Sequence, residues 1–313
     1  MQSALVTGGA GFIGSHLCDF LIKKEFKVTC LDNLITGSKK NIEHLLKNPN
    51  FDFVEFDVAK LFDVQLDSFG YIFHLASPAS PVDYQNYPEE TLLANSLGIL
   101  NVLNLAKKYK SKVLIASTSE IYGDPLEHPQ KETYLGNVNS FGPRSCYDES
   151  KRFAEAASYT FIQKYNLDAR IIRIFNTYGP RMQKNDGRVI SNFINQALGG
   201  ETLRIDGDGT QTRSFCFVSD MVEGVYKAMF SDNTEGEIFN LGNPDEHTVS
   251  DLAVLIIKLT GSKSKTTHSG TFREDDPMRR QPDITKARKY LKWEPKVDLN
   301  EGLLKTIDYY KNA

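Results

Sequence analysis

The stretch Thr7–Gly14 reads TGGAGFIG and stands between a short β-branched run and an amphipathic pattern over residues 12–24. The spacing G-x-x-G-x-x-G between a strand and a helix is typical of a dinucleotide-binding turn. Gly8 would permit the tight turn, and Gly11 would let the backbone approach a pyrophosphate at the positive end of the helix. Gly14 would let that helix pack closely on the strand. This stretch therefore predicts a nucleotide-binding unit at the start of the chain.

Strand and helix patterns alternate outward from this stretch as far as residue 179. Short apolar, β-branched runs predict strands buried on both faces. These runs cover residues 3–7, 28–32, 51–57, 71–75, 113–117 and 169–175. Apolar residues at three- and four-residue spacing predict helices at 12–24, 88–109 and 145–165. The order predicts an α/β fold of the Rossmann type, with a doubly wound parallel sheet.

The pattern becomes mixed after Gly179 and Pro180. Helical spacing recurs at 189–198, 221–230, 249–260, 284–291 and 301–311, separated by short strands. A chain of 313 residues has a length typical of two domains at roughly 150 residues each. We therefore expect a dinucleotide-binding domain over 1–179 and a smaller α+β substrate domain over 180–313, with some segments returning to the first. Their shared cleft should lie beyond the carboxyl ends of the strands.

Composition argues against several classes of partner. The 37 basic and 40 acidic residues give a net charge of −3, without a long block of like charge, so we expect neither nucleic acid nor a membrane surface as a partner. The longest aliphatic run, Leu252–Ile257, is far shorter than the roughly 18 residues of a spanning helix. A signal-like N-terminal segment is not visible, so we expect a cytoplasmic protein. Four scattered cysteines and six scattered histidines predict neither disulfides nor a metal site.

Acidic residues at strand ends indicate which dinucleotide binds. Asp32 ends the second strand 18 residues after Gly14, where its carboxylate would accept hydrogen bonds from an adenosine ribose and repel a 2′-phosphate. NAD is therefore the predicted cofactor, with NADP left open by the nearby Lys39 and Lys40. Asp57, at the end of the third strand, would either meet the adenine amino group or cap a turn.

Polar residues gather at the end of the fifth strand and at the start of a later helix. Thr118, Ser119 and Glu120 follow the strand at its carboxyl end, where the cleft is expected. Tyr147 and Lys151 are four residues apart, so they face the same way on the predicted helix. A neighbouring ammonium favours a phenolate, so we expect Lys151 to lower the pKa of Tyr147 from about 10 and make it a general base. Seen in isolation, a Y-x-x-x-K pair would be interpreted as two exposed side chains on a helix. The glycine stretch and the polar strand end in the same chain favour a catalytic pair instead.

Segments spread over essentially the whole chain resemble the extended short-chain dehydrogenase/reductase family, whose members oxidise and rearrange nucleotide sugars with NAD. Within that family they are most similar to the UDP-glucuronate decarboxylases, also called UDP-xylose synthases. The matching segments are residues 74–81, 117–125, 144–152, 173–182, 185–189, 209–215, 240–244 and 275–283.

The resemblance implies roles for residues along these segments. It implies cofactor contacts at Gly8, Gly11, Phe12, Ile13, Gly14, Asp32, Asn33, Thr36, Gly37, Asp57, Val58, Leu75, Ala76, Ser77, Tyr147, Lys151 and Thr177. For a UDP-sugar substrate it implies Asn176, Arg188, Arg213 and Arg280, with Arg213 and Arg280 clamping the pyrophosphate. A solvated ion pair is the alternative for each arginine. The resemblance also implies a homodimer in which the helices at 88–109 and 145–165 pair with their symmetry mates.

The activity that the resemblance implies is a redox-neutral decarboxylation of UDP-glucuronate to UDP-xylose through a 4-keto intermediate. Family 4,6-dehydratases typically carry Thr-Asp-Glu at the strand end and 4-epimerases typically lack the glutamate, so Thr118, Ser119 and Glu120 favour a decarboxylase. Many decarboxylases have Thr-Leu-Lys-Thr-Asn where this chain has Leu93 and Ala94 in place of the lysine and threonine, which leaves the sugar open. A 4-epimerase, a 4,6-dehydratase and a non-catalytic NAD-sensing protein are the alternatives.

Overall fold

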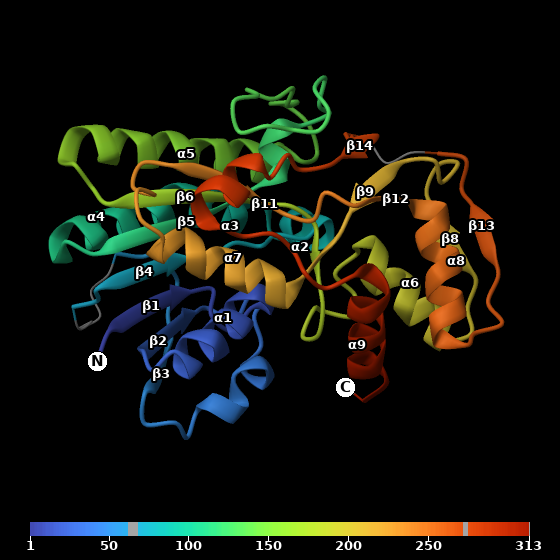
Figure 1. Cartoon of the computed structure of the whole chain (residues 1–313), viewed down its shortest axis with the longest axis horizontal. Helices are drawn as coiled ribbons and strands as arrows, with labels where there is room; N and C mark the ends of the chain where they lie inside the picture. The colour runs from blue at the N-terminus through green and yellow to red at the C-terminus, as the bar shows by residue number, and fades with distance from the viewer. Residues whose placement is uncertain (62–67, 272–274, 313) are drawn as a thin grey trace.

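A seven-stranded parallel sheet forms the centre of the structure, a computed structural model that describes residues 1–61, 68–271 and 275–312 (Figure 1). In spatial order the strands are β11 (Ile238–Leu241), β6 (Ala169–Ile174), β5 (Lys112–Thr118), β4 (Tyr71–His74), β1 (Ser3–Thr7), β2 (Lys27–Asp32) and β3 (Phe51–Glu55). After β3 the chain crosses to the other side of β1, which makes the gap beyond β1 and β4 a topological switch point. The predicted doubly wound α/β fold is confirmed.

Side chains that alternate along the strands fill two cores, one on each face of the sheet. Ala4 and Val6 of β1 belong to one buried cluster, together with Phe73 of β4. Leu5, which points to the opposite face, belongs to the other cluster, together with Ile72. Burial on both faces explains why these strands read as unbroken apolar runs.

Helices cover both faces of this sheet (Figure 1). On one face lie α3 (Pro88–Leu93), the π-helical turn η3 (Ala94–Gly98), α4 (Ile99–Tyr109) and α5 (Ser145–Tyr165), and on the other lie α1 (Phe12–Lys23) and α7 (Val218–Phe230). The helix predicted over 88–109 is thus a run of three successive helical segments. The helix predicted over 145–165 has the bounds expected from its spacing.

The second half of the chain builds a smaller lobe beside the sheet. Its helices are α6 (Val189–Leu198), α8 (Val249–Thr260) and α9 (Leu299–Asn312). Its short sheets are β7 (Thr177–Tyr178) with β10 (Cys216–Phe217), β9 (Thr212–Ser214) with β12 (Glu246–Thr248) and β14 (Arg279–Arg280), and β8 (Leu203–Ile205) with β13 (Thr266–His268). The predicted helix at 284–291 is a short π-helical turn, η5 (Ala287–Leu291).

Two segments of the second half return to the large sheet. β11 pairs in parallel with β6, from Ile238 opposite Ile171 to Leu241 opposite Ile174. α7 packs against α1. Trp293 also contacts α7, because its Nε1 donates to the carbonyl of Asp220 in that helix at 2.9 Å. The division at residue 179 stays a prediction, with β11 and α7 as the returning segments.

Over the described ranges, none of the helices is both long and apolar enough to cross a membrane. Within the same ranges, His, Cys, Asp and Glu side chains form no group of three or more that would hold a metal ion. All four cysteines are free, and three of them, Cys18, Cys30 and Cys216, are buried as small core residues. The cytoplasmic location inferred above stays a prediction.

Candidate functional site

A cavity of about 600 Å³ lies beyond the carboxyl ends of the central strands and extends into the smaller lobe. All the residues predicted above for catalysis, cofactor binding and substrate binding line this cavity. They come from both halves of the chain, from Gly8 in the first turn to Arg280 in β14. The residues that the sequence predicted for the site are therefore brought together by the fold around one cavity.

The glycine stretch forms a cradle at one end of the cavity. Gly8 has φ of +72°, and a Cβ there would lie 2.7 Å from the backbone nitrogen of Ala76. A Cβ on Gly14 would collide with the carbonyl oxygen of Gly8. Among the described residues, α1 has neither a side-chain cap nor an acidic residue in its first turn. Its first N–H groups thus remain available to an anion, as a pyrophosphate requires.

Asp32 presents a buried carboxylate beside this cradle. It accepts hydrogen bonds from the backbone nitrogens of Ala10, at 3.0 Å, and Leu34, at 2.8 Å, and burial raises its pKa. Lys39 pairs with Glu55 at 2.9 Å, so its charge is already partnered. A glycine cradle, an open helix end and a carboxylate in one cavity fit an NAD molecule. Asp57 also lines the cavity and caps the backbone nitrogen of Ala59 at 2.9 Å, which is the turn-capping role left open above.

The predicted catalytic residues meet where β5 ends against α5. Thr118 is the last residue of β5, and its hydroxyl accepts a hydrogen bond from the backbone nitrogen of Glu120 at 3.2 Å. Tyr147 lies in the first turn of α5, where it is buried and lines the cavity. One turn further along, Lys151 donates from Nζ to the carbonyl of Ala116 at 2.9 Å.

The expectation that Lys151 lowers the pKa of Tyr147 is wrong for this structure. Burial raises the pKa of Tyr147 to about 12, and a hydrogen bond with Thr118 is the first influence that acts against the rise. Burial also lowers the pKa of Lys151 to about 7, because a low-dielectric site disfavours the ammonium as well as the phenolate. The Lys151 ammonium lies 5.8 Å from the centre of the Tyr147 ring. Tyr147 therefore holds its proton at neutral pH.

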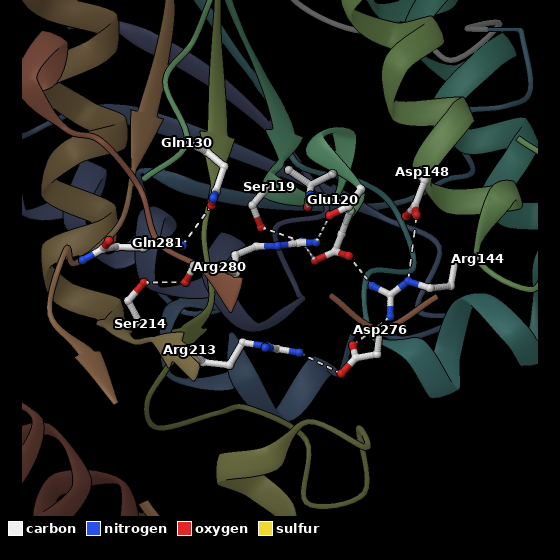
Figure 2. Close-up of polar contacts among 12 residues, drawn as sticks. Ser119, Glu120, Gln130, Arg144, Asp148, Arg213, Ser214, Asp276, Arg280 and Gln281 are labelled. Carbon is white, nitrogen blue, oxygen red and sulfur yellow. Dashed lines mark hydrogen bonds and ion pairs between the residues drawn. The ribbon is translucent and has the colours of Figure 1, made fainter. Parts of the chain in front are cut away.

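Arginines and carboxylates form a cluster around Ser119 and Glu120 (Figure 2). Arg280 is 1% exposed, pairs with Glu120 and donates to the hydroxyl of Ser119 at 3.2 Å. Arg213 is also buried and lies 2.7 Å from Asp276. The alternative of a solvated ion pair is therefore wrong for Arg280 and Arg213. Both predicted clamp residues are held by carboxylates of the protein.

The other two residues predicted to bind the substrate, Arg188 and Asn176, also line the cavity. Arg188 is partly exposed and its Nε is 3.6 Å from a carboxylate oxygen of Asp186. Asn176 lines the cavity between β6 and β7. Leu93 and Ala94, which replace the lysine and threonine of many decarboxylases, also line the cavity. The departure from the family pattern therefore faces the site rather than the solvent.

Burial and neighbouring charges shift the pKa values of two carboxyl groups of the cluster in opposite directions. Burial disfavours ionised Glu120, but the guanidinium groups of Arg280 and Arg144 outweigh it and lower the pKa to about 2. Burial together with the Glu120 charge raises the pKa of Asp148 to about 8. Glu120 is thus ionised across the physiological range, while Asp148 takes up a proton near neutrality.

Among the cavity-lining residues that the sequence analysis did not assign to the site are Tyr84, Arg144 and Asp276. Tyr84 stacks on Tyr147, and Arg144 contacts both Glu120 and Asp276. Arg144 and Asp276 lie inside segments that carried the family resemblance, which was the available signal. Tyr84 lies three residues after the end of the segment 74–81.

Comparison with known proteins places the chain among nucleotide-sugar enzymes. The family model described as GDP-mannose 4,6 dehydratase matches residues 5–306. The chain is 50% identical over 307 residues to UDP-glucuronic acid decarboxylase 1 of Xenopus tropicalis, covering 98% of this chain and 72% of that protein. The chain belongs to the extended short-chain dehydrogenase/reductase family. A second member, UDP-glucuronic acid decarboxylase 1 of Arabidopsis thaliana, is 49% identical, with 98% of this chain and 69% of that protein covered.

Two solved structures share the fold over 99% of this chain and 99% of their own chains. UDP-glucose 4-epimerase of Thermotoga maritima matches with a TM-score of 0.90 at 33% identity. UDP-glucuronic acid 4-epimerase of Bacillus cereus, solved in complex with UDP-glucuronic acid and NAD, matches with a TM-score of 0.90 at 28% identity. The family predicted from the sequence is thereby confirmed, and its members bind NAD.

Proposed function

We propose that this protein decarboxylates UDP-glucuronate to UDP-xylose, with NAD as a resident cofactor and with no net redox change. The observation that carries the proposal is the junction of Ser119, Glu120 and Arg280 beside Tyr147 in one buried site. Support also comes from about 50% identity to curated UDP-glucuronic acid decarboxylases over 98% of the chain.

The cofactor would be held at the glycine cradle. Bound there, NAD would supply a hydride acceptor for C4 of the sugar and a donor of the same hydride at the end of the cycle. Gly8, Gly11 and Gly14 would leave room for its pyrophosphate at the start of α1. Asp32 would accept hydrogen bonds from the adenosine ribose, and its charge would disfavour the 2′-phosphate of NADP.

Tyr147 would act as the general base. It would act as the phenolate, after losing its own proton to solvent, a loss that a cationic nicotinamide ring and protonated Lys151 would favour. The phenolate would take the proton of the sugar 4-hydroxyl when C4 is oxidised and return that proton to the 4-oxygen when the ketone is reduced. Because the site raises the pKa of Tyr147 to about 12, proton transfer needs positive charge and hydrogen bonds close to the phenol. Thr118 supplies a hydrogen bond to it, and Lys151 supplies a cation once protonated.

Loss of CO₂ would follow, beside Ser119, Glu120 and Arg280. The 4-keto sugar acid is a β-keto acid, so the bond to the carboxylate breaks with its electron pair moving onto the ketone. Ser119 and Arg280 would orient the leaving carboxylate by hydrogen bonds; because Arg280 contacts Ser119 and Glu120, we assign it to the sugar carboxylate rather than to the pyrophosphate. Because Glu120 is ionised, the proton for C5 would come from solvent and pass through water held by the Glu120 carboxylate.

The UDP moiety would be bound by groups of the smaller lobe. Arg213, with Arg188 and Asn176 beside it, would face the pyrophosphate. In the structure Arg213 is neutralised by Asp276, so binding of the diphosphate would replace a protein carboxylate by a substrate anion. Such an exchange avoids leaving a buried guanidinium unpaired.

Product identification tests the proposal. Purified protein is incubated with UDP-glucuronate, with and without added NAD, and released CO₂ and the mass of the UDP-sugar are measured. We expect CO₂ and UDP-pentose. Absence of both, with NAD supplied, would defeat the proposal. A product that keeps the substrate mass would instead identify a 4-epimerase, the candidate favoured by the fold match to a UDP-glucuronic acid 4-epimerase.

We also propose that the protein is a homodimer. Large apolar side chains are exposed along α3, η3 and α5, namely Leu92, Leu97, Phe153 and Tyr159. Pairing of these helices with those of a second copy would bury these side chains. Sedimentation velocity at micromolar concentration should show a dimer, and Leu97→Asp should shift it toward monomer. A monomeric wild-type protein would refute the proposal.

A further inference from the structure

Arg144 joins two carboxylates, and each of these is also bound by a second arginine (Figure 2). Nη2 of Arg144 pairs with Oε2 of Glu120, whose Oε1 pairs with Arg280. Nη1 of Arg144 lies 3.2 Å from Oδ1 of Asp276, whose Oδ2 lies 2.7 Å from Arg213. Each carboxylate therefore divides its two oxygens between Arg144 and one further arginine of the cavity.

The three arginines come from different parts of the fold. Arg144 directly precedes α5, the helix that carries Tyr147, and is buried with Nε 3.8 Å from Asp148. Arg213 lies in β9 and Arg280 in β14, which pair with each other in the smaller lobe. Arg144 is thus fixed to the large sheet, on the side of Glu120, whereas the other two arginines approach from across the cavity.

An anionic substrate competes for only part of this cluster. Under the proposed function, the sugar carboxylate and the diphosphate take hydrogen bonds from Arg280 and Arg213. Glu120 and Asp276 then each lose one of their two cationic partners. A largely buried carboxylate such as Glu120 is costly without a cation, and it either moves or takes up a proton; Asp276, whose side chain is 35% exposed, would turn toward water. Arg144, which contacts both carboxylates through separate nitrogens, is the partner that stays.

We propose that Arg144 is a positioning residue that holds Glu120 and Asp276 in place when the anionic groups of the substrate take over Arg280 and Arg213. The inference rests on the proposed function, because that function gives Glu120 its proton-relay task. It differs from a structural ion pair in that its effect appears in the protonation and placement of Glu120 during turnover.

The surroundings of Glu120 give the inference a pH signature. Glu120 is faced by the cations Arg280, Arg144 and Arg213 and by the ionisable groups Tyr84, Tyr147, Asp148 and Asp276. The arginines hold the pKa of Glu120 near 2. Removal of the Arg144 charge raises the pKa of Glu120, so activity should be lost at a higher pH on the acid side. The shift should be largest in kcat, which reports the substrate complex.

The test compares Arg144→Gln with Arg144→Lys. For Arg144→Gln we expect kcat to fall by about tenfold or more, because positioned acid–base groups contribute roughly 100-fold or more. The acid limb of the kcat profile should move to higher pH, while the dissociation constant of UDP, measured by calorimetry, changes less than about twofold. Arg144→Lys keeps the charge and should restore the acid limb, but its single ammonium lacks the fork that holds two carboxylates, so kcat stays below that of wild type.

Arg152→Gln is the matched control, since it makes the same change two turns further along α5. Arg152 donates from Nη1 to the carbonyls of Ile121, at 3.1 Å, and Leu135, at 2.9 Å, and its Nε lies 3.8 Å from Glu149. It ties α5 to the turn that contains Glu120 without contributing its charge to the cluster. We expect lower thermal stability with an unshifted kcat profile.

The outcomes separate this inference from the proposed function. If wild-type protein releases no CO₂, the proposed function fails. If wild type is active and Arg144→Gln keeps its kcat and its acid limb, the positioning role is overturned. Loss of UDP affinity by the same factor as kcat would also overturn it, because Arg144 would then contact the substrate. Should Arg144→Gln fail to fold, Arg144→Lys decides: an unchanged kcat overturns the inference.

Discussion

The rings of Tyr84 and Tyr147 lie face to face, with their centres 5.1 Å apart and their planes 8° from parallel. Tyr84 belongs to α2 (Pro81–Asn86), whereas Tyr147 belongs to α5, so the stack joins two helices that border the cavity. The carbonyl of Tyr84 also accepts a hydrogen bond from Sγ of Cys146 at 3.5 Å. The plane of the proposed general base is therefore set by a neighbouring aromatic ring before any substrate arrives.

Tyr147→Phe should remove turnover while leaving substrate binding intact. The variant keeps the ring stack but loses the hydroxyl that would carry the proton of the sugar 4-oxygen. We expect kcat to fall by roughly 100-fold to 10,000-fold, the range for a general base. The dissociation constant of UDP, measured by calorimetry, should stay within about twofold of wild type. Loss of UDP binding would show instead that Tyr147 supports the structure of the site.

Tyr84→Phe and Tyr84→Leu should separate the ring of Tyr84 from its hydroxyl. Among the described residues that hydroxyl is buried without a hydrogen-bond partner, so its removal should change the free energy of unfolding by less than about 1 kcal/mol. Tyr84→Leu loses the stack and should cost about 1 kcal/mol more and lower kcat. Urea unfolding and steady-state kinetics provide the measurements. Equal loss of kcat in both variants would mean that the hydroxyl itself acts on the substrate.

Gly14→Ala should destroy the dinucleotide cradle. The added Cβ would meet the carbonyl oxygen of Gly8, which belongs to the backbone and has no rotamer by which to move away. We expect a loss of stability of about 1–3 kcal/mol and loss of NAD binding in calorimetry. Gly70→Ala is the control, because its Cβ would have 3.7 Å to the nearest atom. Undiminished NAD affinity in Gly14→Ala would show that the cofactor lies elsewhere.

His74 should make the protein less stable in mild acid. Burial lowers its pKa from 6.5 to about 3, so below pH 6.5 the unfolded chain takes up a proton that the folded chain rejects. The free energy of unfolding should therefore fall by about 1.4 kcal/mol for each pH unit between 6.5 and 3 from this group. In His74→Gln this contribution is absent, so urea unfolding at pH 7 and pH 5 should differ less than in wild type. An equal pH dependence in both proteins would contradict the assignment.

Most of the large sheet was predictable because its strands are buried on both faces and carry a strong local signal. The strands expected at 3–7 and 28–32 agree with β1 and β2 to within a residue. The position of β11 was not predictable, since the sequence of a four-residue strand does not indicate that it pairs with β6 at the edge of the large sheet. The break of the long helix into α3, η3 and α4 likewise depends on tertiary packing.

In the site, the residues to which the resemblance gave a role were predicted, but the ion pairs that join them, and the bridging residue Arg144, were not. Glu120 and Arg280 were both assigned, but their pairing joins positions 160 residues apart. The role of Arg144 could not be predicted, because it depends on folding to place Arg144 between Glu120 and Asp276. The pKa of Tyr147 was predicted in the wrong direction because the spacing of Tyr147 and Lys151 contains no information on the depth of burial.

The pairing of β11 with β6 affects how the chain is made. During synthesis, residues 1–179 emerge with the backbone groups of one side of β6 still unpaired, and an unpaired strand edge invites association with other chains. The dinucleotide-binding half therefore completes its sheet only after residue 241 has left the ribosome. A fragment that stops at Gly179 would carry the whole glycine cradle, but it would lack both β11, which ends the complete sheet, and α7, which packs on β5 and β6. Expression of that half alone should therefore yield aggregate rather than a small nucleotide-binding protein.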